Sequence, residues 1–258
     1  MLTGFRIAVA ILLGLAFGSF LTVLISRVPA GESILRPRSR CPGCGVALRT
    51  ADLVPVVSWL ALRGRCRSCG ARISAVYPLV ELACTGLFVA VALVFEDLWQ
   101  AFLLAPFLGI LLALSVIDIR TKKIPNRIVY PSVPVAAIYI VVADLAGGSL
   151  DVVLGGLGFL AYGLGLLIVA LIAPRGMGMG DVKLAGFIGL VLGSLGLRFV
   201  AVAAGAGIVL GGVGAIVALA QGATRKTGIP YGPFMAGGAL VACFFGDQIA
   251  DAYIRLFN

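Results

Sequence analysis

The stretch VVLGGLGFLAYGLGLLIVALIA, residues Val152–Ala173, contains no charged side chain. As an α-helix with a rise of about 1.5 Å per residue it would be about 33 Å long, enough to cross the roughly 30 Å hydrocarbon core of a bilayer. Its several glycines indicate close packing against neighbouring helices, because small residues let membrane helices approach one another. The stretch therefore predicts a transmembrane helix.

Similar apolar stretches recur along the chain, and together they predict eight membrane spans. The sixth span is short, and Gly237 and Gly238 are expected to break the last one. The first span ends at Arg27, without a small-residue cleavage site, so it is expected to stay as a membrane helix and not to be removed as a signal peptide. The predicted spans are Thr3–Ser26, Ser74–Phe95, Trp99–Ile117, Ile128–Leu145, Val152–Ala173, Val182–Leu195, Phe199–Ala220 and Pro233–Ala250.

The overall composition agrees with a membrane protein. Of 258 residues, 61% are hydrophobic and 12% charged, whereas soluble domains have about 25% charged residues. The chain also contains no histidine. This absence excludes catalysis by an imidazole base and zinc sites with histidine ligands, so carboxylates and thiols remain as the groups that can carry chemistry.

The positions of the basic residues predict the orientation. Nearly all of the 20 Lys and Arg residues fall between spans on one face, and only Arg6, Arg198 and Arg255 fall on the other. The positive-inside rule therefore places the basic face in the cytoplasm and both termini outside. The cytoplasmic segments are the residues from Arg27 to Arg72, the loop at Arg120–Arg127, the loop with Arg175 and Lys183, and the loop with Arg225 and Lys226.

Four cysteines form two CxxC pairs in the longest segment between spans. They are Cys41, Cys44, Cys66 and Cys69, and a glycine follows each pair. Two such pairs can give four thiolate ligands to one tetrahedral zinc ion, which would be structural because no coordination position stays open. The spacing also permits an iron–sulfur cluster or a loop without metal, whereas two disulfides are disfavoured in a reducing cytoplasm.

These observations predict an all-α polytopic membrane protein with about eight transmembrane helices and a small cytoplasmic zinc-binding loop domain. The expected organisation is a first transmembrane helix (1–27), a four-cysteine zinc domain (28–73) and a second transmembrane domain (74–258). Without a metal, the segment 28–73 is too short to bury a core.

Two aspartates, Asp118 and Asp181, lie at the predicted cytoplasmic ends of spans, where ionisable residues are costly and suggest function. Each also has a structural interpretation: Asp181 as a helix N-cap, and Asp118 as a partner of Arg120 or Lys122. Together they could share one proton, so that one carboxylate activates water and the other protonates the leaving amine of a peptide bond. Glycines before Asp181 would let the backbone bend there and admit an extended substrate.

The chain resembles the type IV prepilin peptidases, bifunctional leader peptidases and N-methyltransferases of the GxGD aspartyl protease class. Thr22 and Tyr231 stand where that family usually has Asn and Phe. The motifs that carry the resemblance are Gly18–Pro29, Pro37–Cys44, Arg63–Cys69, Tyr77–Glu81, Asp118 with Ile124-Pro125, Gly176–Leu184 and Ile229–Phe234.

The resemblance implies that Asp118 and Asp181 are the catalytic pair, that residues 74–258 form a transmembrane aspartyl peptidase domain, and that the cysteine loop is linked to methylation. It implies as substrates type IV prepilins and pseudopilins of type II secretion, each with a basic leader before a hydrophobic helix and cut at the cytoplasmic face of the bacterial inner membrane. The new amino terminus would be methylated from S-adenosyl-L-methionine. Membrane lipid is the other expected partner, and no nucleic acid is expected.

Glu81 is a candidate cofactor-binding residue. It lies one turn after Tyr77, near the basic loop, and could orient the methyl donor or the substrate amine. The structural interpretation of Glu81 is a buried ion pair with an arginine such as Arg72.

Three further functions fit part of the sequence: a transporter with an aspartate proton or ion relay, a zinc-stapled scaffold without chemistry, or a peptidase that does not methylate.

Overall fold

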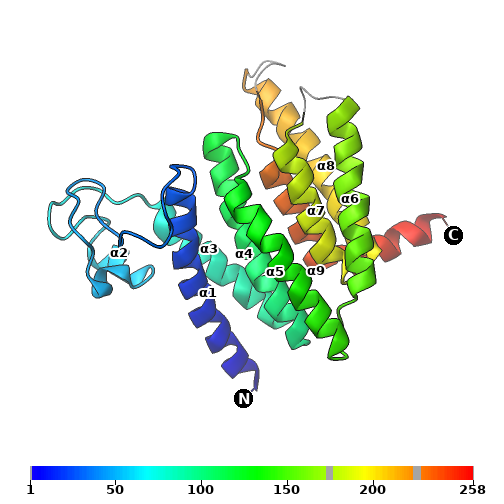
Figure 1. The fold of residues 1–258 in the computed structure, drawn as a ribbon, viewed down its shortest axis with the longest axis horizontal. Coiled ribbons are helices and arrows are strands. Elements are labelled where there is room, and N and C mark those ends of the chain that lie inside the picture. The colour runs from blue at the N-terminus through cyan, green and yellow to red at the C-terminus, as the bar shows by residue number, and fades with distance from the viewer. Residues whose placement is uncertain (1, 173–176, 223–227, 258) are drawn as a thin grey trace. The chain divides into compact units, whose positions relative to one another are not determined.

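The computed structural model describes residues 2–172, 177–222 and 228–257. In this part of the chain all regular structure is helical, apart from two isolated bridges (Figure 1). The predicted span end at Ala173, the motif residue Gly176 and the basic residues Arg175, Arg225 and Lys226 lie outside the described residues. The elements are α1 (Leu2–Arg27), the 3-10 helix η1 (Thr50–Leu53), α2 (Val57–Ala61), α3 (Val76–Val94), α4 (Leu98–Thr121), α5 (Asn126–Leu145), α6 (Val152–Ile172), α7 (Met179–Gly193), α8 (Leu197–Ala220) and α9 (Gly232–Phe257).

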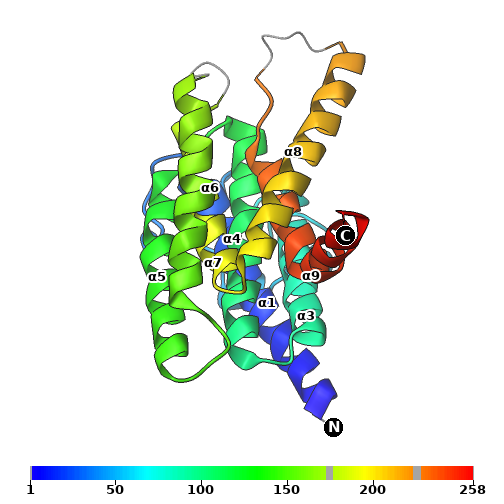
Figure 2. The same ribbon diagram turned by 90° about the vertical axis from the view of Figure 1, so that its right-hand side faces the viewer.

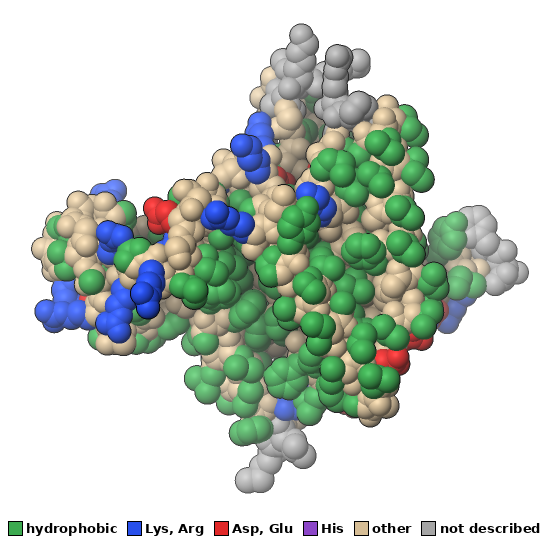
Figure 3. Space-filling model, viewed as in Figure 1, with side chains coloured by type: hydrophobic (Ala, Val, Ile, Leu, Met, Phe, Trp, Pro, Cys, Tyr) green, Lys and Arg blue, Asp and Glu red, His purple; other side chains and the backbone are tan. Residues whose placement is uncertain are grey.

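The eight predicted spans correspond to α1 and α3–α9, and the prediction of an all-α membrane protein is confirmed. Among the described residues, seven helices are long and apolar enough to cross a membrane, all except α7. Figure 3 shows hydrophobic side chains covering much of the visible face of the helices. This is the surface expected of helices that face lipid.

Helix α7 has 15 residues, about 22 Å, and is too short to span a bilayer by itself. Every residue from Leu184 to Gly193 is buried. Because a helix that is apolar on all sides belongs in a protein interior, α7 forms the core of its unit and is surrounded by neighbouring helices (Figure 2).

The chain forms two compact units, Met1–Glu96 and Asp97–Asn258. In the first unit, α1 packs on α3 through glycines: a Cβ atom on Gly14 would lie 2.7 Å from Thr85 Cα, and one on Gly18 would lie 2.9 Å from Glu81 Cα. Only residues without a side chain permit this approach.

In the second unit the closest helix pairs are α6 with α7 and α8 with α9. A methyl group on Gly158 of α6 would meet the carbonyl oxygen of Gly189 and come within 2.8 Å of Gly193 Cα, both on α7. On α9, a methyl group on Gly238 would meet the backbone of Ala203 and Gly207 of α8.

The expected break at Gly237 and Gly238 is wrong, because α9 is one helix from Gly232 to Phe257. Gly238 is there for packing: it lies against the backbone of α8, where a larger residue would not fit.

Candidate active site and metal centre

Asp118 lies in the last turn of α4, and its side chain is buried. The helix ends three residues later, where Lys122 adopts a left-handed conformation (φ 53°) and donates its N–H to the Asp118 carbonyl. The Asp118 carboxylate accepts a hydrogen bond at Oδ2 from the backbone N–H of Gly232, at 3.0 Å. A Cβ atom on Gly232 would lie 2.8 Å from this oxygen, so glycine is what lets the backbone of the α9 N-terminus reach the carboxylate.

Gly232 is a site residue that sequence reasoning missed. The motif Ile229–Phe234 contributed to the resemblance, but it indicated no contact with Asp118. The available signal was a Tyr-Gly-Pro turn directly before an apolar run. Such a turn indicates where a helix starts, but it does not indicate that Gly232 contacts a residue as distant in the sequence as Asp118.

Asp181 is the third residue of α7, and its Oδ2 accepts a hydrogen bond from the backbone N–H of Gly178 at 3.1 Å. The Asp181 side chain therefore does cap the start of α7, as the structural interpretation expected. It does so from the third helical position, however, because the N-cap residue is Gly178. The expectation that glycines bend the backbone before Asp181 holds for Gly178 but not for Gly180. Gly178 is extended, whereas Gly180 is helical and lets α7 approach Ile124, whose Cβ would be 3.0 Å from an added methyl group.

Asp118 and Asp181 come from different helices of the second unit, α4 and α7. Both lie beside the start of α9, Asp118 at Gly232 and Asp181 near Tyr231. Within the described residues no ion pair joins Asp118 to Arg120 or Lys122, so the structural interpretation of Asp118 is wrong. Lys183 donates a hydrogen bond from Nζ to Asn126 Oδ1 at 3.1 Å and lies over the ring of Tyr130. Its ammonium group is therefore directed to α5 and not to the aspartates.

Tyr231 borders the same site and was also missed as a neighbour of the aspartates. Its half-buried position and the nearby negative charge of Asp181 raise the pKa of Tyr231. A Cβ atom on Gly211 of α8 would lie 2.9 Å from the Tyr231 ring, so this glycine makes room for the ring.

The four predicted metal ligands meet in the first unit. The Sγ atoms of Cys41, Cys44, Cys66 and Cys69 all lie within 4.8 Å of one another. The Cys41 and Cys69 Sγ atoms are 3.8 Å apart, too far for a disulfide but equal to the edge of a tetrahedron with zinc–sulfur bonds of about 2.3 Å. The four cysteines could therefore hold a metal ion.

The two CxxC pairs sit in equivalent turns. The N–H of Gly45 donates to the Cys41 carbonyl at 2.8 Å, the N–H of Gly70 donates to the Cys66 carbonyl at 2.9 Å, and both glycines have φ near +70°. The backbone N–H groups of Cys69 and Ser68 lower the pKa of the Cys66 thiol to about 6, which favours the thiolate that metals bind. In the same turn the Ala71 N–H lowers the pKa of the Cys69 thiol, but the neighbouring thiols and burial outweigh it and raise that pKa to about 11, so a metal would have to displace the Cys69 proton.

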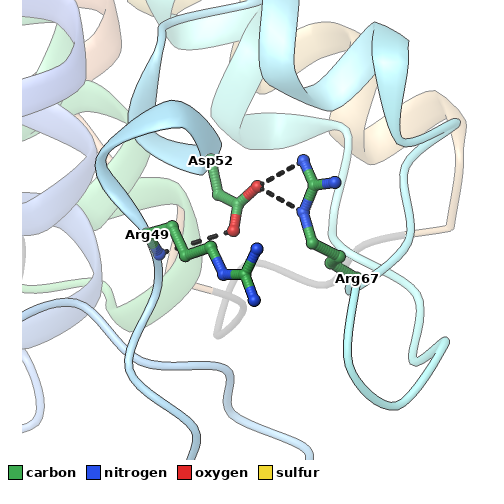
Figure 4. Close-up of polar contacts among 3 residues, drawn as sticks. All are labelled: Arg49, Asp52 and Arg67. Atoms are coloured by element: carbon green, nitrogen blue, oxygen red, sulfur yellow. Dashed lines mark hydrogen bonds and ion pairs between the residues drawn. The ribbon is translucent and has the colours of Figure 1, made fainter.

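An ion pair ties the second turn to η1 (Figure 4). Arg67, inside the second CxxC pair, donates from Nε and Nη2 to Asp52 Oδ1 at 2.9 and 2.8 Å. These contacts hold the pKa of Asp52 below its usual value. The side chain of Asp52 is only 7% exposed, so the contact orders the segment more than an open surface pair would.

Glu81 is buried on α3, and among the described residues no ion pair joins it to Arg72 or another arginine, so the structural interpretation of Glu81 is wrong. Its Oε2 accepts the backbone N–H of Val56 at 2.7 Å, and the Ser19 hydroxyl also hydrogen-bonds to it. Val56 has φ 61° and ψ −53°, a γ-turn conformation that is strained for a β-branched residue. Glu81 thus holds a strained turn of the loop against α1 and α3.

In comparisons with known proteins, each of the two units matches a different family model. Residues 12–95 match the model of the bacterial Peptidase A24 N-terminal domain, and residues 105–245 match the type IV leader peptidase family. A prepilin leader peptidase/N-methyltransferase of Bacillus subtilis is 34% identical over 97% of this chain and 98% of its own length. Proteins with the same name from Stutzerimonas stutzeri (35%, 95% and 93%) and Aeromonas hydrophila (32%, 95% and 93%) are similar in extent. No solved structure matches. The chain belongs to the type IV leader peptidase family.

Proposed function

We propose that this protein is an aspartic endopeptidase that removes the basic leader of type IV prepilins and pseudopilins, and that it N-methylates the new amino terminus. The observation that supports the peptidase half is that Asp118 of α4 and Asp181 of α7 both lie beside the start of α9, at Gly232 and Tyr231. The names of full-length relatives support both activities.

The hydrogen bonds suggest how the pair works. Each carboxylate has its Oδ2 held by a backbone N–H, from Gly232 for Asp118 and from Gly178 for Asp181. Oδ1 of each carboxylate then remains for the shared proton, the water and the substrate. One aspartate takes a proton from the water that attacks the scissile carbonyl carbon, and the other gives its proton to the leaving amine nitrogen.

The proposed substrate lies with its apolar helix in the membrane and its leader at the cytoplasmic face, where the basic loops of this chain are predicted to lie. Gly178, extended before Asp181, offers backbone that a substrate strand could approach. On this basis the chain is a multi-pass protein of the bacterial inner membrane with its site facing the cytoplasm.

We assign the four cysteines to a structural zinc ion, because four thiolates leave no open position for catalysis. S-adenosyl-L-methionine supplies the methyl group in the methylation reaction. Glu81 is the proposed residue for orienting the methyl donor or the amine, from its buried position beside the loop. The division into 1–27, 28–73 and 74–258 remains our proposal for how these functions are distributed.

The test is cleavage of a prepilin in membranes by Asp118→Asn and Asp181→Asn variants. Either change removes half of the acid–base pair while keeping an oxygen for the backbone N–H, so cleavage should fall by about 10²-fold or more without loss of folding. Asp144→Asn, an exposed aspartate at the end of α5, is the matched control and should cleave normally. Substantial cleavage by either site variant would reject the catalytic pair. If the protein were a scaffold without chemistry, neither substitution would change its function.

A further inference from the structure

The region of η1 and α2 exposes an unusual amount of apolar surface. Leu53, Val54, Val57 and Leu60 lie within eight residues of one another, and their exposed fractions run from 42% to 61%. A concentration of exposed aliphatic side chains in so short a segment marks an interaction surface. We call these four residues the α2 apolar face.

The α2 apolar face belongs to an ordered part of the segment. Arg67 holds Asp52 just before it, Glu81 holds Val56 inside it, and the Trp59 Nε1 donates to the Ile73 carbonyl at 3.1 Å. The Trp59 ring also lies against Gly64, where a Cβ atom would come within 2.8 Å of it. The surface is therefore preformed, which lowers the entropic cost of binding.

The connections of this segment indicate what covers the face. The segment leaves the membrane helix α1 at Arg27 and enters the membrane helix α3 at Val76. In Figure 1, α2 lies at the lower edge of the segment, on the side toward which α1 and α3 both run. The helix α2 thus lies on the side of the segment that is directed to the bilayer.

The charge of the segment agrees with a lipid partner. Residues 28–73 contain eight arginines but only two acidic residues, Glu32 and Asp52, and Asp52 is already paired with Arg67. Figure 3 shows basic side chains gathered over this part of the molecule. Arg63 and Arg65, directly after α2, are exposed. Arginines beside inserted apolar side chains suit the phosphates of anionic lipids.

We propose that the α2 apolar face inserts into the headgroup region of the bilayer crossed by α1 and α3, and that Arg63 and Arg65 bind anionic phospholipid there. A basic prepilin leader does not fit this surface, because its charge has the same sign. The proposal does not depend on the peptidase assignment.

Tryptophan fluorescence can test this in the full-length protein. The chain has two tryptophans, so Trp99→Phe, in the second unit, leaves Trp59 of α2 as the single reporter. The protein is placed in nanodiscs that contain brominated phosphatidylcholine or brominated phosphatidylglycerol at equal mole fraction. We expect quenching by both lipids, and about twofold stronger quenching by the anionic lipid.

Two sets of near-isosteric variants separate the parts of the proposal. Val57→Thr with Leu60→Asn should remove most of the quenching. Arg63→Gln with Arg65→Gln should abolish only the preference for phosphatidylglycerol. Val46→Thr, at an exposed valine in the first CxxC turn, is the matched control and should change neither result. Thermal unfolding of each variant checks that the exposed substitutions leave the fold intact.

Absence of Trp59 quenching, or quenching that the Val57 and Leu60 changes do not reduce, would overturn insertion and leave a protein partner for this face. Equal quenching by the two lipids in the parent protein would overturn the assignment of Arg63 and Arg65 to anionic lipid.

Discussion

The segment between α1 and α3 and the bundle of α4–α9 reach an ordered structure by opposite means. In residues 28–75 only Val28, Cys41, Gly64 and Cys66 are buried, and two of these are proposed metal ligands. In α7, every residue from Leu184 to Gly193 is buried against neighbouring helices. In the first region a cluster of four cysteines that could hold a metal stands where a core would be, whereas in the second region close backbone packing through glycine provides the core.

The largest expected effect is that of removing one thiolate from the segment. Cys66→Ser should unfold residues 28–73, because metal binding to so small a unit supplies most of its folding free energy. Asp118 and Asp181 belong to the other unit, whose packing does not require this segment to be ordered. Because methylation is proposed to depend on the segment, methylation should fall more than cleavage does.

The measurement is paired: mature pilin is scored by its size, and its amino-terminal methyl group by mass spectrometry, in the same membranes. A zinc chelator should reproduce the pattern, with cleavage resistant in the short term. Equal loss of both activities would show that the segment also serves the peptidase.

The second prediction concerns the glycine packing of the bundle. Gly158→Ala should destabilise the protein by about 3 kcal/mol, because the added methyl group meets the Gly189 carbonyl and the Gly193 backbone. Gly156→Ala on the same helix is the control: its methyl group meets nothing within 4 Å, so stability should be unchanged or slightly raised. Thermal unfolding in detergent compares the two, and equal stabilities would contradict the packing account.

A third prediction concerns the contact between Glu81 and Val56, which joins the segment to its helices. Glu81→Leu leaves the Val56 N–H without its acceptor and should cost about 1–3 kcal/mol, whereas Glu81→Gln keeps an acceptor oxygen and should cost less. Val56→Gly should stabilise the turn, because glycine adopts φ 61° without strain.

Hydrogen exchange of residues 50–62 reports this contact. The same variants assayed for methylation separate the two roles of Glu81: if Glu81→Gln preserves the turn but abolishes methylation, the carboxylate charge is needed for the reaction. If Glu81→Gln preserves both, Glu81 is a positioning residue only.

The smallest expected effect lies inside the bundle. The Tyr162 hydroxyl of α6 is buried and has no hydrogen-bond partner among the described residues. Tyr162→Phe should therefore leave stability unchanged or raise it by less than about 1 kcal/mol. Tyr139→Phe, which loses a 3.1 Å bond to the Trp99 carbonyl, should lower it by about 1 kcal/mol. A clear loss of stability in Tyr162→Phe would contradict the assignment of an unpaired hydroxyl.

Much of this protein could be read from the sequence because the signals are local. Among the described residues, apolar run length located α1 and α3–α9 to within a few residues at most ends, the exception being the C-terminal end of α9. The CxxC spacing with glycine at Gly45 and Gly70 indicated the two turns, whose positive φ angles the structure confirms. Asp118 and Asp181 stood out as candidates because carboxylates are rare in such a chain.

Only the tertiary structure decided how these parts meet. It placed the short α7 at the centre of a unit, brought the Gly232 N–H to the Asp118 carboxylate, and used Glu81 to hold a strained valine in place of an ion pair. Gly232 and Asp118 are separated by 114 positions in the sequence. Periodicity and spacing report the environment of a residue along one helix, whereas such contacts depend on which helices pack together and how closely their backbones approach.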